Sequence, residues 1–539
     1  MSATTLHSSS VVIDDLTFAW PDGSPVLRHL RAAFSAGRTG LIGANGSGKS
    51  TLLRLIAHEL TPSSGSITTS GSVGYLPQQL TLRTGTTLAE LLGVRRQLDA
   101  LRAIEAGDVA QRHFDELGDG WDVEARARAE LGRIGLAGVD LDRVVGTLSG
   151  GETVLAALAG LRLADTAIVL LDEPTNNLDR QARHRLYDAI SSWRGTLVVV
   201  SHDVTLLELM DETAELRSSG LSIYGGGYSA YREQVALEQQ AAEQALRTAE
   251  QGLRTEQRQR VAAETALARR RRYARTDFEN KRRPKIIMNQ RKGEAQVSAG
   301  RLRGQLDAKV DQARRAVDER AELVRRDQRI RVDLPDPGVP AARHLAELHD
   351  GRGVIVVRGP ERVAITGRNG IGKTRLVETL ADPARAVGRT VHAVPRTDRV
   401  GYLPQVTDHL ADHVSVLDTV RAAAPGVPPG DIRAALARFL LGADAVSRPV
   451  GSLSGGERFR VALARLLLAS PPHQLLVLDE PTNDLDLDTR AQLVDALNDY
   501  HGGLVVVSHD DEFLAQLGID TWVRLDDAGL TLSEPVRDR

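Results

Sequence analysis

The chain has 539 residues, of which 42% are hydrophobic, and this length predicts several folding units instead of one hydrophobic core. No run approaches the roughly 18–20 apolar residues that a membrane helix needs, and Met1–Ser10 has neither a basic start nor an apolar run. We therefore expect a cytoplasmic protein with no membrane segment. The absence of cysteine excludes disulfides, zinc–thiolate sites and iron–sulfur clusters.

The formal net charge of -3 conceals an uneven distribution of charge along the chain. Residues 231–330 carry 25 Lys and Arg against 15 Asp and Glu, which is a surplus of 10 positive charges. The rest of the chain is correspondingly acidic. This contrast marks the middle of the chain as a segment of a different kind.

Five short motifs occur twice in the same order, which indicates an internal duplication. Each copy alternates short β-branched runs with helical stretches, the pattern of an α/β domain with a largely parallel sheet. We therefore predict two homologous α/β domains, at residues 1–230 and 331–539, on either side of a different segment, 231–330. The first copy reads GANGSGKS (43–50), GYLPQ (74–78), LSGGE (148–152), IVLLDEPTNNLD (168–179) and VVVSHD (198–203), and the second reads GRNGIGKT (367–374), GYLPQ (401–405), LSGGE (453–457), LLVLDEPTNDLD (475–486) and VVVSHD (505–510).

The first motif of each copy has the pattern G-x-x-x-x-G-K-[ST] between a β-rich run and a helical run. Its glycines let backbone N–H groups surround phosphates at a helix N-terminus, and its lysine neutralises the phosphate charge. A single match would also fit a structural glycine-rich turn. Because each match is followed by an apolar strand that ends in Asp-Glu, we predict two ATP sites. The expected binding residues are Gly43, Asn45, Gly46, Gly48, Lys49, Ser50 and Thr51 in the first copy and Gly367, Asn369, Gly370, Gly372, Lys373 and Thr374 in the second.

The Asp-Glu pairs predict a metal ligand followed by a general base. Asp172 and Asp479 are expected to hold Mg²⁺, and Glu173 and Glu480 are expected to polarise the attacking water. The predicted reaction is hydrolysis of ATP to ADP and phosphate, with Mg²⁺ as cofactor. The expected metal ligands are Ser50, Thr374, Gln78, Gln405, Asp172 and Asp479.

The remaining motifs also fit contacts to ATP. Gln78 and Gln405 are placed to sense the γ-phosphate, the metal and the water, although a strand-end turn explains their motif equally well. His202 and His509 each end an all-valine strand and can hydrogen-bond the γ-phosphate, whereas a solitary histidine is more often structural. The LSGGE motifs place a serine and two glycines before a helix, which suits an anion. Their candidate residues are Ser149, Gly150, Gly151, Glu152, Ser454, Gly455, Gly456 and Glu457.

The middle segment has no strand-like run and few Gly or Pro residues before Pro284. Small and apolar residues recur at helical spacing on both sides of this proline. We therefore predict two long helices packed as an antiparallel hairpin, with the turn near Pro284. Arms of about 45 residues would each extend roughly 65–70 Å. The repeating residues are Ala242, Leu246, Ala249 and Leu253, and then Leu306, Val310, Ala313, Val317 and Val324.

The five motifs, in this order, resemble the Walker A, Q-loop, signature, Walker B and switch-histidine motifs of the ATP-binding-cassette superfamily. The resemblance implies one monomer in which two cassettes pair head to tail, with each nucleotide between the Walker A motif of one and the signature of the other. Residues 43–50 would then face Ser454–Glu457, and residues 367–374 would face Ser149–Glu152.

The same resemblance gives Trp20 the place of the aromatic residue that stacks on adenine. Residues 331–366, before the second Walker A motif, contain no Phe, Tyr or Trp, and only His344 and His349 are available as substitutes. We therefore expect the second site to hold adenine less firmly than the first.

Two fused cassettes, a long charged linker and no membrane helix resemble the ABC-F family of translation factors. The junction YGGGYSAYREQ (224–234) is also similar to that family. The resemblance implies binding to ribosomal RNA near the tRNA exit site and the P-site tRNA, with the linker hairpin pointing toward the peptidyl-transferase centre.

The charge of the linker agrees with a partner made of RNA. Residues 254–303 hold 16 Lys and Arg against 5 Asp and Glu, although a solvated coiled-coil face is the simpler alternative. Basic groups would bind phosphates, and an aromatic ring would stack on unpaired bases. The candidate RNA contacts are Arg269, Arg270, Arg271, Arg272, Tyr273, Lys281, Arg282, Arg283, Lys285 and Met288.

The branch of the family is indicated by the length of the first cassette. Relatives that gate translation by energy state carry an arm between Q-loop and signature, but here that interval exceeds the one in the second cassette by only 70 − 48 = 22 residues. Short cassettes with a long linker resemble the actinobacterial antibiotic-resistance branch, which protects the ribosome. The alternatives are a housekeeping translation factor of the same family, an ATPase subunit of a drug exporter and a DNA-structure ATPase.

Overall fold

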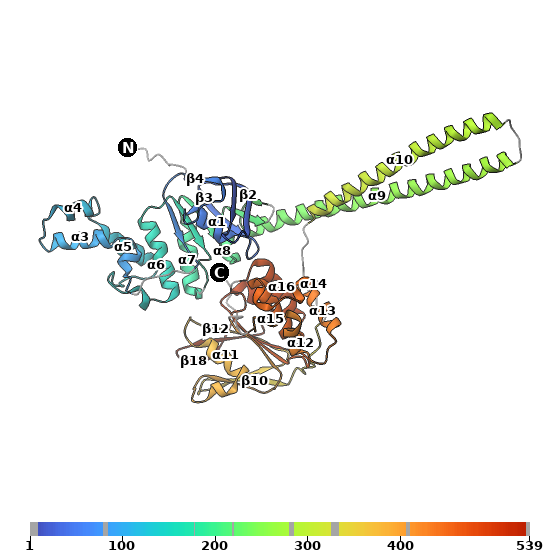
Figure 1. Cartoon of the computed structure of the whole chain (residues 1–539). Coiled ribbons are helices and arrows are strands. Elements are labelled where there is room, and N and C mark those ends of the chain that lie inside the picture. The colour runs from blue at the N-terminus through green and yellow to red at the C-terminus, as the bar shows by residue number, and fades with distance from the viewer. Residues whose placement is uncertain are drawn as a thin grey trace. The chain divides into compact units, whose positions relative to one another are not determined.

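The computed structural model describes residues 9–78, 85–176, 178–217, 220–279, 285–324, 334–405, 410–483 and 485–534. Its contacts divide the chain into two compact units. One unit combines Met1–Ser229 with Arg329–Arg539, and the other is Ala230–Gln328. The larger unit contains both copies of the repeated motifs, and the smaller one is helical (Figure 1).

The first half of the larger unit is an α/β domain with two sheets. The six-stranded sheet has the order β5-β6-β7-β3-β8-β9, and the three-stranded sheet has the order β2-β1-β4. Its strands are β1 (Val11–Ala19), β2 (Pro25–Phe34), β3 (Gly37–Ile42), β4 (Ser64–Thr69), β5 (Val73–Leu76), β6 (Ile168–Asp172), β7 (Thr196–Val200), β8 (Glu212–Arg217) and β9 (Gly220–Gly225). Its helices are α1 (Lys49–Ile56), α2 (Leu88–Leu91), α3 (Arg95–Glu105), α4 (Gln111–Leu117), α5 (Val123–Arg133), α6 (Gly150–Leu163), α7 (Arg180–Ser191) and α8 (Val204–Glu208).

The second half repeats this plan, with a six-stranded sheet in the order β14-β15-β16-β12-β17-β18 and a three-stranded sheet in the order β11-β10-β13. Its strands are β10 (His344–His349), β11 (Val354–Arg358), β12 (Arg362–Thr366), β13 (His392–Pro395), β14 (Val400–Leu403), β15 (Leu475–Asp479), β16 (Gly503–Val507), β17 (Thr521–Asp526) and β18 (Gly529–Ser533). Its helices are α11 (Lys373–Ala381), α12 (Val416–Ala423), α13 (Pro429–Arg438), α14 (Ala443–Val446), α15 (Gly455–Leu467), α16 (Leu487–Asn498) and α17 (Asp511–Gln516).

The central strands of both large sheets are parallel and completely buried. In β6 and β7, and again in β15 and β16, every residue is buried, which explains their continuous apolar sequences. The glycine-rich loops follow the carboxyl ends of β3 and β12, the Asp-Glu pairs lie at the ends of β6 and β15, and the histidine motifs follow β7 and β16. Ligands bind at this edge in open parallel sheets, so the topology gathers these three motifs there. The LSGGE motifs lie elsewhere, at the N-termini of α6 and α15.

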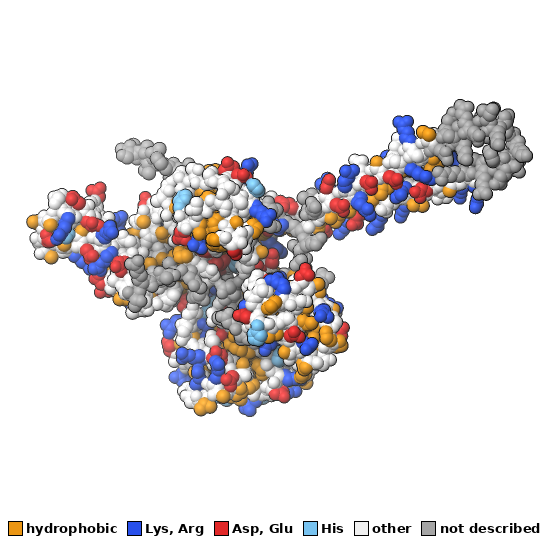
Figure 2. All heavy atoms as spheres, in the orientation of Figure 1, with side chains coloured by type: hydrophobic (Ala, Val, Ile, Leu, Met, Phe, Trp, Pro, Cys, Tyr) orange, Lys and Arg blue, Asp and Glu red, His pale blue; other side chains and the backbone are white. Residues whose placement is uncertain are grey.

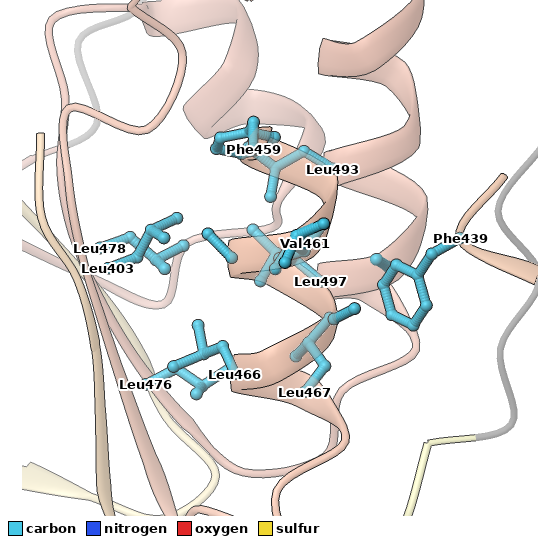
Figure 3. Packing of buried hydrophobic residues seen from close by; sticks show 14 of the residues in the cluster. Leu403, Phe439, Phe459, Val461, Leu466, Leu467, Leu476, Leu478, Leu493 and Leu497 are labelled. Atoms are coloured by element: carbon cyan, nitrogen blue, oxygen red, sulfur yellow. The ribbon is translucent and has the colours of Figure 1, made fainter. Parts of the chain in front are cut away.

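The helices pack on the sheets through large apolar side chains. In the second domain, Phe459 and Val461 of α15 face Leu493 and Leu497 of α16, while Leu466 lies near Leu476 of β15 (Figure 3). All of these side chains are buried. The core therefore fixes α15, and with it the LSGGE motif at its N-terminus, against the strand that ends in Asp479.

The longer interval in the first domain is occupied by an additional helical pair. Helices α3 and α4 contact each other, and α3 is tied back to the domain by ion pairs. Arg95 lies within ion-pair distance of Asp142, and Arg102 lies 2.8 Å from the same carboxylate. This pair is short, in keeping with the small surplus of residues.

The smaller unit consists of α9 (Tyr228–Glu279) and α10 (Lys285–Leu323), which lie side by side as an antiparallel hairpin (Figure 1). The two helices have 52 and 39 residues, so the predicted arms of about 45 residues are unequal in length. Most predicted stripe residues, such as Leu246 and Val310, are half-buried, and Arg260 pairs with Asp307 across the hairpin at 2.9 Å. Pro284, the predicted turn, lies outside the described residues.

Along the described part of the hairpin, Lys and Arg side chains alternate with Asp and Glu (Figure 2). Throughout the part of the chain that the structure describes, each helix is either too short or too polar to cross a lipid bilayer.

Candidate nucleotide sites

The two glycine-rich loops have the same geometry. Gly48 and Gly372 cap α1 and α11 with left-handed φ angles of 99° and 106°, a conformation that favours glycine. A Cβ atom at Gly43 would lie 2.4 Å from the Leu216 carbonyl oxygen, and one at Gly367 would lie 2.3 Å from that of Leu525. Only glycine therefore fits where each loop leaves its strand. The arrangement forms two anion cradles at helix N-termini.

The lysine of each loop folds back over its own cradle. Lys49 Nζ donates to the carbonyl oxygens of Gly43 at 2.7 Å and Ala44 at 3.1 Å. Lys373 Nζ makes the same bonds to Gly367 at 2.9 Å and Arg368 at 3.2 Å. Burial lowers the pKa of both lysines, and nearby carboxylates oppose this shift. The ammonium groups are thus positioned at the phosphate side of each loop.

The strand-end aspartates are buried beside the hydroxyl residue of each loop. Burial raises the pKa of Asp172, whereas hydrogen bonds from Ser50 and Tyr75 and the charge of Lys49 oppose the rise. Burial likewise raises the pKa of Asp479, and the Thr374 hydroxyl opposes it. The structure therefore brings each predicted aspartate to its predicted serine or threonine.

These groups suit a small, hard cation. Asp172 Oδ1 and both carboxylate oxygens of Asp479 are buried, and among the described residues none of the three accepts a hydrogen bond of good geometry. Carboxylate and hydroxyl oxygens are the donors that Mg²⁺ prefers in phosphate sites, where it keeps water and phosphate oxygens as further ligands. The donor sets of Asp172 with Ser50 and of Asp479 with Thr374 therefore fit Mg²⁺.

The two predicted general bases share an unusual backbone conformation. Glu173 and Glu480 have φ angles of 49° and 46°, in the left-handed region that side-chain-bearing residues seldom adopt. Both side chains are buried. Such conformations cost roughly 1–3 kcal/mol each and are concentrated at functional sites. Burial raises the pKa of Glu480 to about 7.

Each glutamate lies beside the predicted switch histidine of its own domain. His202 Nε2 is 3.2 Å from Glu173 Oε1, and His509 Nε2 is 3.4 Å from Glu480 Oε1. Burial and the nearby lysine lower the pKa of each histidine to about 3, so both imidazoles are neutral near pH 7. His509 Nε2 also lies 2.7 Å from Lys373 Nζ, which joins lysine, histidine and glutamate into one cluster.

Residues from each domain reach the glycine-rich loop of the other. The backbone N–H of Asn45 donates to Asp486 Oδ2 at 2.8 Å, and the charge of Asp486 opposes the lowering of the Lys49 pKa by burial. In the opposite direction, the charge of Asp179 acts on Lys373. A cavity of about 310 Å³ combines residues of both domains, and its lining includes Leu178, Arg183, Asn369, Gly370, Gly372, Lys373, Thr374, Gln405, Glu480, Asn483 and His509.

The signature residues occupy the N-termini of α6 and α15 but do not line this cavity. Ser149 and Ser454 are N-caps, and each accepts a hydrogen bond from the backbone N–H of the glutamate three residues later. That glutamate, Glu152 or Glu457, bonds back to the serine N–H, which completes a capping box. The expected approach of residues 149–152 to the second glycine-rich loop therefore remains a prediction.

The candidate base-binding residues differ between the domains. Trp20 follows β1, is 37% exposed and packs edge-on against Phe18 at 5.1 Å, so part of its ring surface is open. His349 ends β10 and is stacked on His392 at 5.0 Å, with its Nε2 3.3 Å from Glu347 Oε2. His344 begins β10 and is exposed. The second domain therefore presents imidazoles where the first presents an indole.

The two predicted glutamines have different surroundings. Gln78 and Gln405 are both exposed, each two residues after the end of its strand, β5 or β14. Gln405 lines the cavity that contains Lys373 and Glu480.

Few of the predicted RNA contacts can be placed. Arg269, Arg270 and Arg272 are exposed near the end of α9. The side chains of Arg271, Tyr273, Lys285 and Met288, and all of Lys281, Arg282 and Arg283, lie outside the part that the structure describes.

Sequence reasoning missed the residues that join the two domains. Asp179 and Asp486 end the duplicated strings DEPTNNLD and DEPTNDLD, so their equal spacing from Asp172 and Asp479 was a usable signal. Arg183 and Arg490 follow at equal spacing again. Nothing in the sequence alone indicates that Asp179, Asp486 and Arg183 reach the opposite domain.

Comparison with known proteins agrees with this geometry. A family model described as "ABC transporter" matches residues 27–176 and 356–483. The chain is 34% identical to the tylosin resistance ATP-binding protein TlrC of Streptomyces fradiae, over 94% of this chain and 95% of that protein. It is also 32% identical to the putative ATP-binding protein YdiF of Bacillus subtilis, over 89% and 74% of the two chains.

Solved structures show the same fold at lower identity. The structure described as "RNase-L Inhibitor" matches with a TM-score of 0.52 and 18% identity, covering 97% of this chain and 88% of that one. The "Model of ribosome-bound archaeal Pelota and ABCE1" matches with a TM-score of 0.51 and 20% identity, over 97% and 77% of the chains.

Proposed function

Because this chain belongs to the ATP-binding-cassette family, in its ABC-F branch, we propose that it hydrolyses ATP at two sites formed by its own two cassettes. The observation that carries the proposal is the cross-domain geometry around the glycine-rich loops. Asp486 of the second cassette binds the loop of the first, and Arg183 of the first cassette lines the cavity of the second. Each site thus draws on both cassettes within one monomer.

The residues of each site divide the work of hydrolysis. The loop N–H groups and Lys49 or Lys373 bind the phosphates, and Glu173 or Glu480 orients the attacking water and accepts its proton. His202 or His509, held neutral, lies 3.2 or 3.4 Å from that glutamate and helps to hold it in position. Asp172 with Ser50, and Asp479 with Thr374, would hold Mg²⁺, which would supply positive charge to the phosphate oxygens. Gln78 and Gln405 are the remaining candidates for contact with the metal and the water.

The signature residues would complete each site from the opposite cassette. Ser149 and Ser454, with the glycines that follow them, present helix N-termini that suit an anion. Closure of the cassettes around ATP would bring Ser454–Glu457 to residues 43–50 and Ser149–Glu152 to residues 367–374.

The test of hydrolysis is steady-state phosphate release by the purified full chain. Glu173→Gln combined with Glu480→Gln keeps the size of both side chains and removes both general bases. We expect turnover to fall at least about a hundredfold, because general-base catalysis contributes about 10²–10⁴-fold. Turnover near that of the natural sequence would contradict the assignment.

We further propose that the ATP cycle acts in the cytoplasm on the ribosome, near the exit-site and P-site tRNA, through the α9–α10 hairpin. Similarity to TlrC, a tylosin resistance protein, supports a role in protecting the ribosome from antibiotics. The basic surplus of the hairpin supports a partner made of RNA. Alternatives are a housekeeping translation factor and the ATPase subunit of a drug exporter.

The resistance role can be tested in a susceptible bacterium that expresses the chain. We expect the minimal inhibitory concentration of tylosin, or of another drug that binds the peptidyl-transferase region, to rise at least fourfold. The Glu173→Gln/Glu480→Gln variant is the matched control and should give no rise. If the protein is expressed and hydrolyses ATP but the bacterium stays fully susceptible to tylosin and to the other drugs that bind this region, the resistance role is wrong. The housekeeping alternative would then be favoured.

A further inference from the structure

Two arginines occupy equivalent positions in the cassettes, four residues after the aspartate that ends each repeated Walker B string. Arg183 lies in the first turn of α7, and Arg490 lies in the first turn of α16. Both side chains are largely buried, with 16% and 7% exposed. Burial without a partner would be costly for either charge, so their surroundings show how each charge is used.

Arg490 is neutralised within its own cassette. Its Nη1 lies 3.0 Å from Asp510 Oδ2, and its Nη2 donates to Asp510 Oδ1 at 3.1 Å and to Glu512 Oε2 at 3.2 Å. Two carboxylates therefore hold one guanidinium in a fixed, forked arrangement.

Arg183 lacks this double restraint. Thr205 stands where the second cassette has Glu512, and the remaining carboxylate, Asp203, accepts a hydrogen bond from Tyr187 at 2.6 Å. The second cassette has Val494 in place of Tyr187, so Asp510 has no such competitor at that position. As a result, Arg183 Nη1 is 3.7 Å from Asp203, and its Nε is buried with no hydrogen-bond partner among the described residues.

The guanidinium of Arg183 is directed at the second nucleotide site. Its Nη1 lies 3.5 Å from the backbone oxygen of His509, and its side chain lines the cavity together with Lys373 and Glu480. Its charge also lowers the pKa of His509, as the charge of Arg490 lowers the pKa of His202 in the first site, so the two arginines differ in their carboxylate partners and not in this effect. A second cross-cassette contact, the ion pair between Arg180 and Asp511 at 2.7 Å, holds the start of α7 against the same segment.

We propose that Arg183 is supplied by the first cassette to the second nucleotide site, where its guanidinium binds the terminal phosphate of ATP. The proposal rests on the ATP hydrolysis proposed above, and it makes the two sites chemically unequal. A planar guanidinium with a free Nε–H can pair with phosphate oxygens, and an arginine delivered in trans stabilises the charge that develops during phosphoryl transfer. Arg490, saturated by two carboxylates, has no equal role in the first site.

The proposal is tested at one site at a time. Lys49→Ala removes nucleotide binding at the first site, and in this background turnover and the equilibrium affinities for Mg·ATP and Mg·ADP report the second site. We expect Arg183→Gln to lower turnover at least tenfold and ATP affinity at least fivefold, while ADP affinity changes less than twofold. Arg183→Lys should recover part of the ATP preference, because it restores the charge without the fork.

A second variant keeps the arginine in place. Thr205→Glu gives Arg183 the second carboxylate that Arg490 already has, so it should draw the guanidinium back into its own cassette and lower second-site turnover at least threefold. The matched control is Arg490→Gln. It is measured in a Lys373→Ala background, in which only the first site binds nucleotide, and the preference of that site for ATP over ADP should change less than twofold.

The outcomes separate the two proposals. Equal losses of ATP and ADP affinity with Arg183→Gln, or unchanged turnover with both Arg183→Gln and Thr205→Glu, would show that Arg183 is only structural. If Glu480→Gln abolishes turnover in the same Lys49→Ala background, ATP hydrolysis stands whether or not the role of Arg183 fails.

Discussion

The backbone N–H of Asn45 donates a 2.8 Å hydrogen bond to Asp486, which lies 441 residues further along the chain. The same carboxylate caps α16 through the N–H of Thr489 at 2.8 Å. One side chain therefore starts a helix in the second cassette and fixes the glycine-rich loop in the first.

Asp486→Asn separates these two roles. Asparagine is an equally good N-cap, so the free energy of unfolding should change by less than about 1 kcal/mol. Hydrogen bonds to charged groups contribute about 1.5–3 kcal/mol, so loss of the charged contact to the loop should lower ATP turnover about tenfold. Asp486→Ala, which also removes the cap, should show both defects. Turnover unchanged in Asp486→Asn would mean that the cross-cassette bond does not matter for catalysis.

Trp20 and His349 predict unequal adenine binding. Trp20→Ala in a Lys373→Ala background should weaken ATP binding at the first site by about 1–3 kcal/mol, the scale of base–aromatic stacking. Trp20→Phe should retain most of the affinity. His349→Ala in a Lys49→Ala background should cost less, because that ring is already stacked on His392. Isothermal titration with Mg·ATP measures each loss, and equal losses at the two sites would refute the asymmetry.

The two buried histidines predict a dependence of stability on pH. Burial and a nearby lysine lower the pKa of His202 and His509 to about 3, below the ordinary value of 6.5. Between these values the unfolded chain binds more protons than the folded chain, so the stability is present above pH 6.5 and is lost as the pH falls toward 3. From pH 7.5 to 5.5 the two groups together should remove about 3 kcal/mol of stability.

Urea unfolding of the natural chain and of His202→Gln/His509→Gln at both pH values measures this contribution. The double variant should lose about 3 kcal/mol less stability over this interval than the natural chain. Identical pH dependence in the two proteins would mean that these histidines already titrate normally in the folded state.

Each signature serine caps a helix and is also proposed to contact nucleotide, and a substitution that keeps the cap can separate these two roles. Ser454→Asn keeps an N-cap on α15, so stability should change by less than about 0.5 kcal/mol, whereas Ser454→Ala should cost about 1 kcal/mol. If Ser454 reaches nucleotide in the closed state, both variants should lower turnover in a Lys373→Ala background about equally. A defect confined to Ser454→Ala would assign this serine to the cap alone.

The sequence was sufficient for the parts of the fold that depend on local chemistry. The loops that need glycine at Gly43 and Gly48, the strands β6 and β15, which are apolar up to their last residue, and the polar hairpin follow from spacing and composition. The mixed α/β architecture with a long helical insertion is confirmed. Membership of the ABC-F family is also confirmed.

The contacts that join the two cassettes at the nucleotide sites could not be predicted from the sequence. The repeat marks Asp486 and the equal spacing marks Arg183, but their contacts come from the packing of one cassette against the other, which the sequence does not show. The hydrogen bond from Tyr187 to Asp203 joins α7 to the start of α8, and the two residues are 16 positions apart in sequence. The assigned roles of the ATP-site residues and the RNA contacts on the hairpin remain predictions.

The central claim, that ATP binding by the two cassettes drives binding to the ribosome, is tested most directly by co-sedimentation of the Glu173→Gln/Glu480→Gln chain with purified ribosomes. With Mg·ATP, we expect most of the protein to pellet with ribosomes. With Mg·ADP, or with Lys49→Ala and Lys373→Ala added to abolish nucleotide binding, little should pellet. Replacing Arg269, Arg270 and Arg272 with Gln should flatten the salt dependence of binding, because fewer counterions are released from RNA. Equal sedimentation with ATP and ADP, or none with either, would contradict the account.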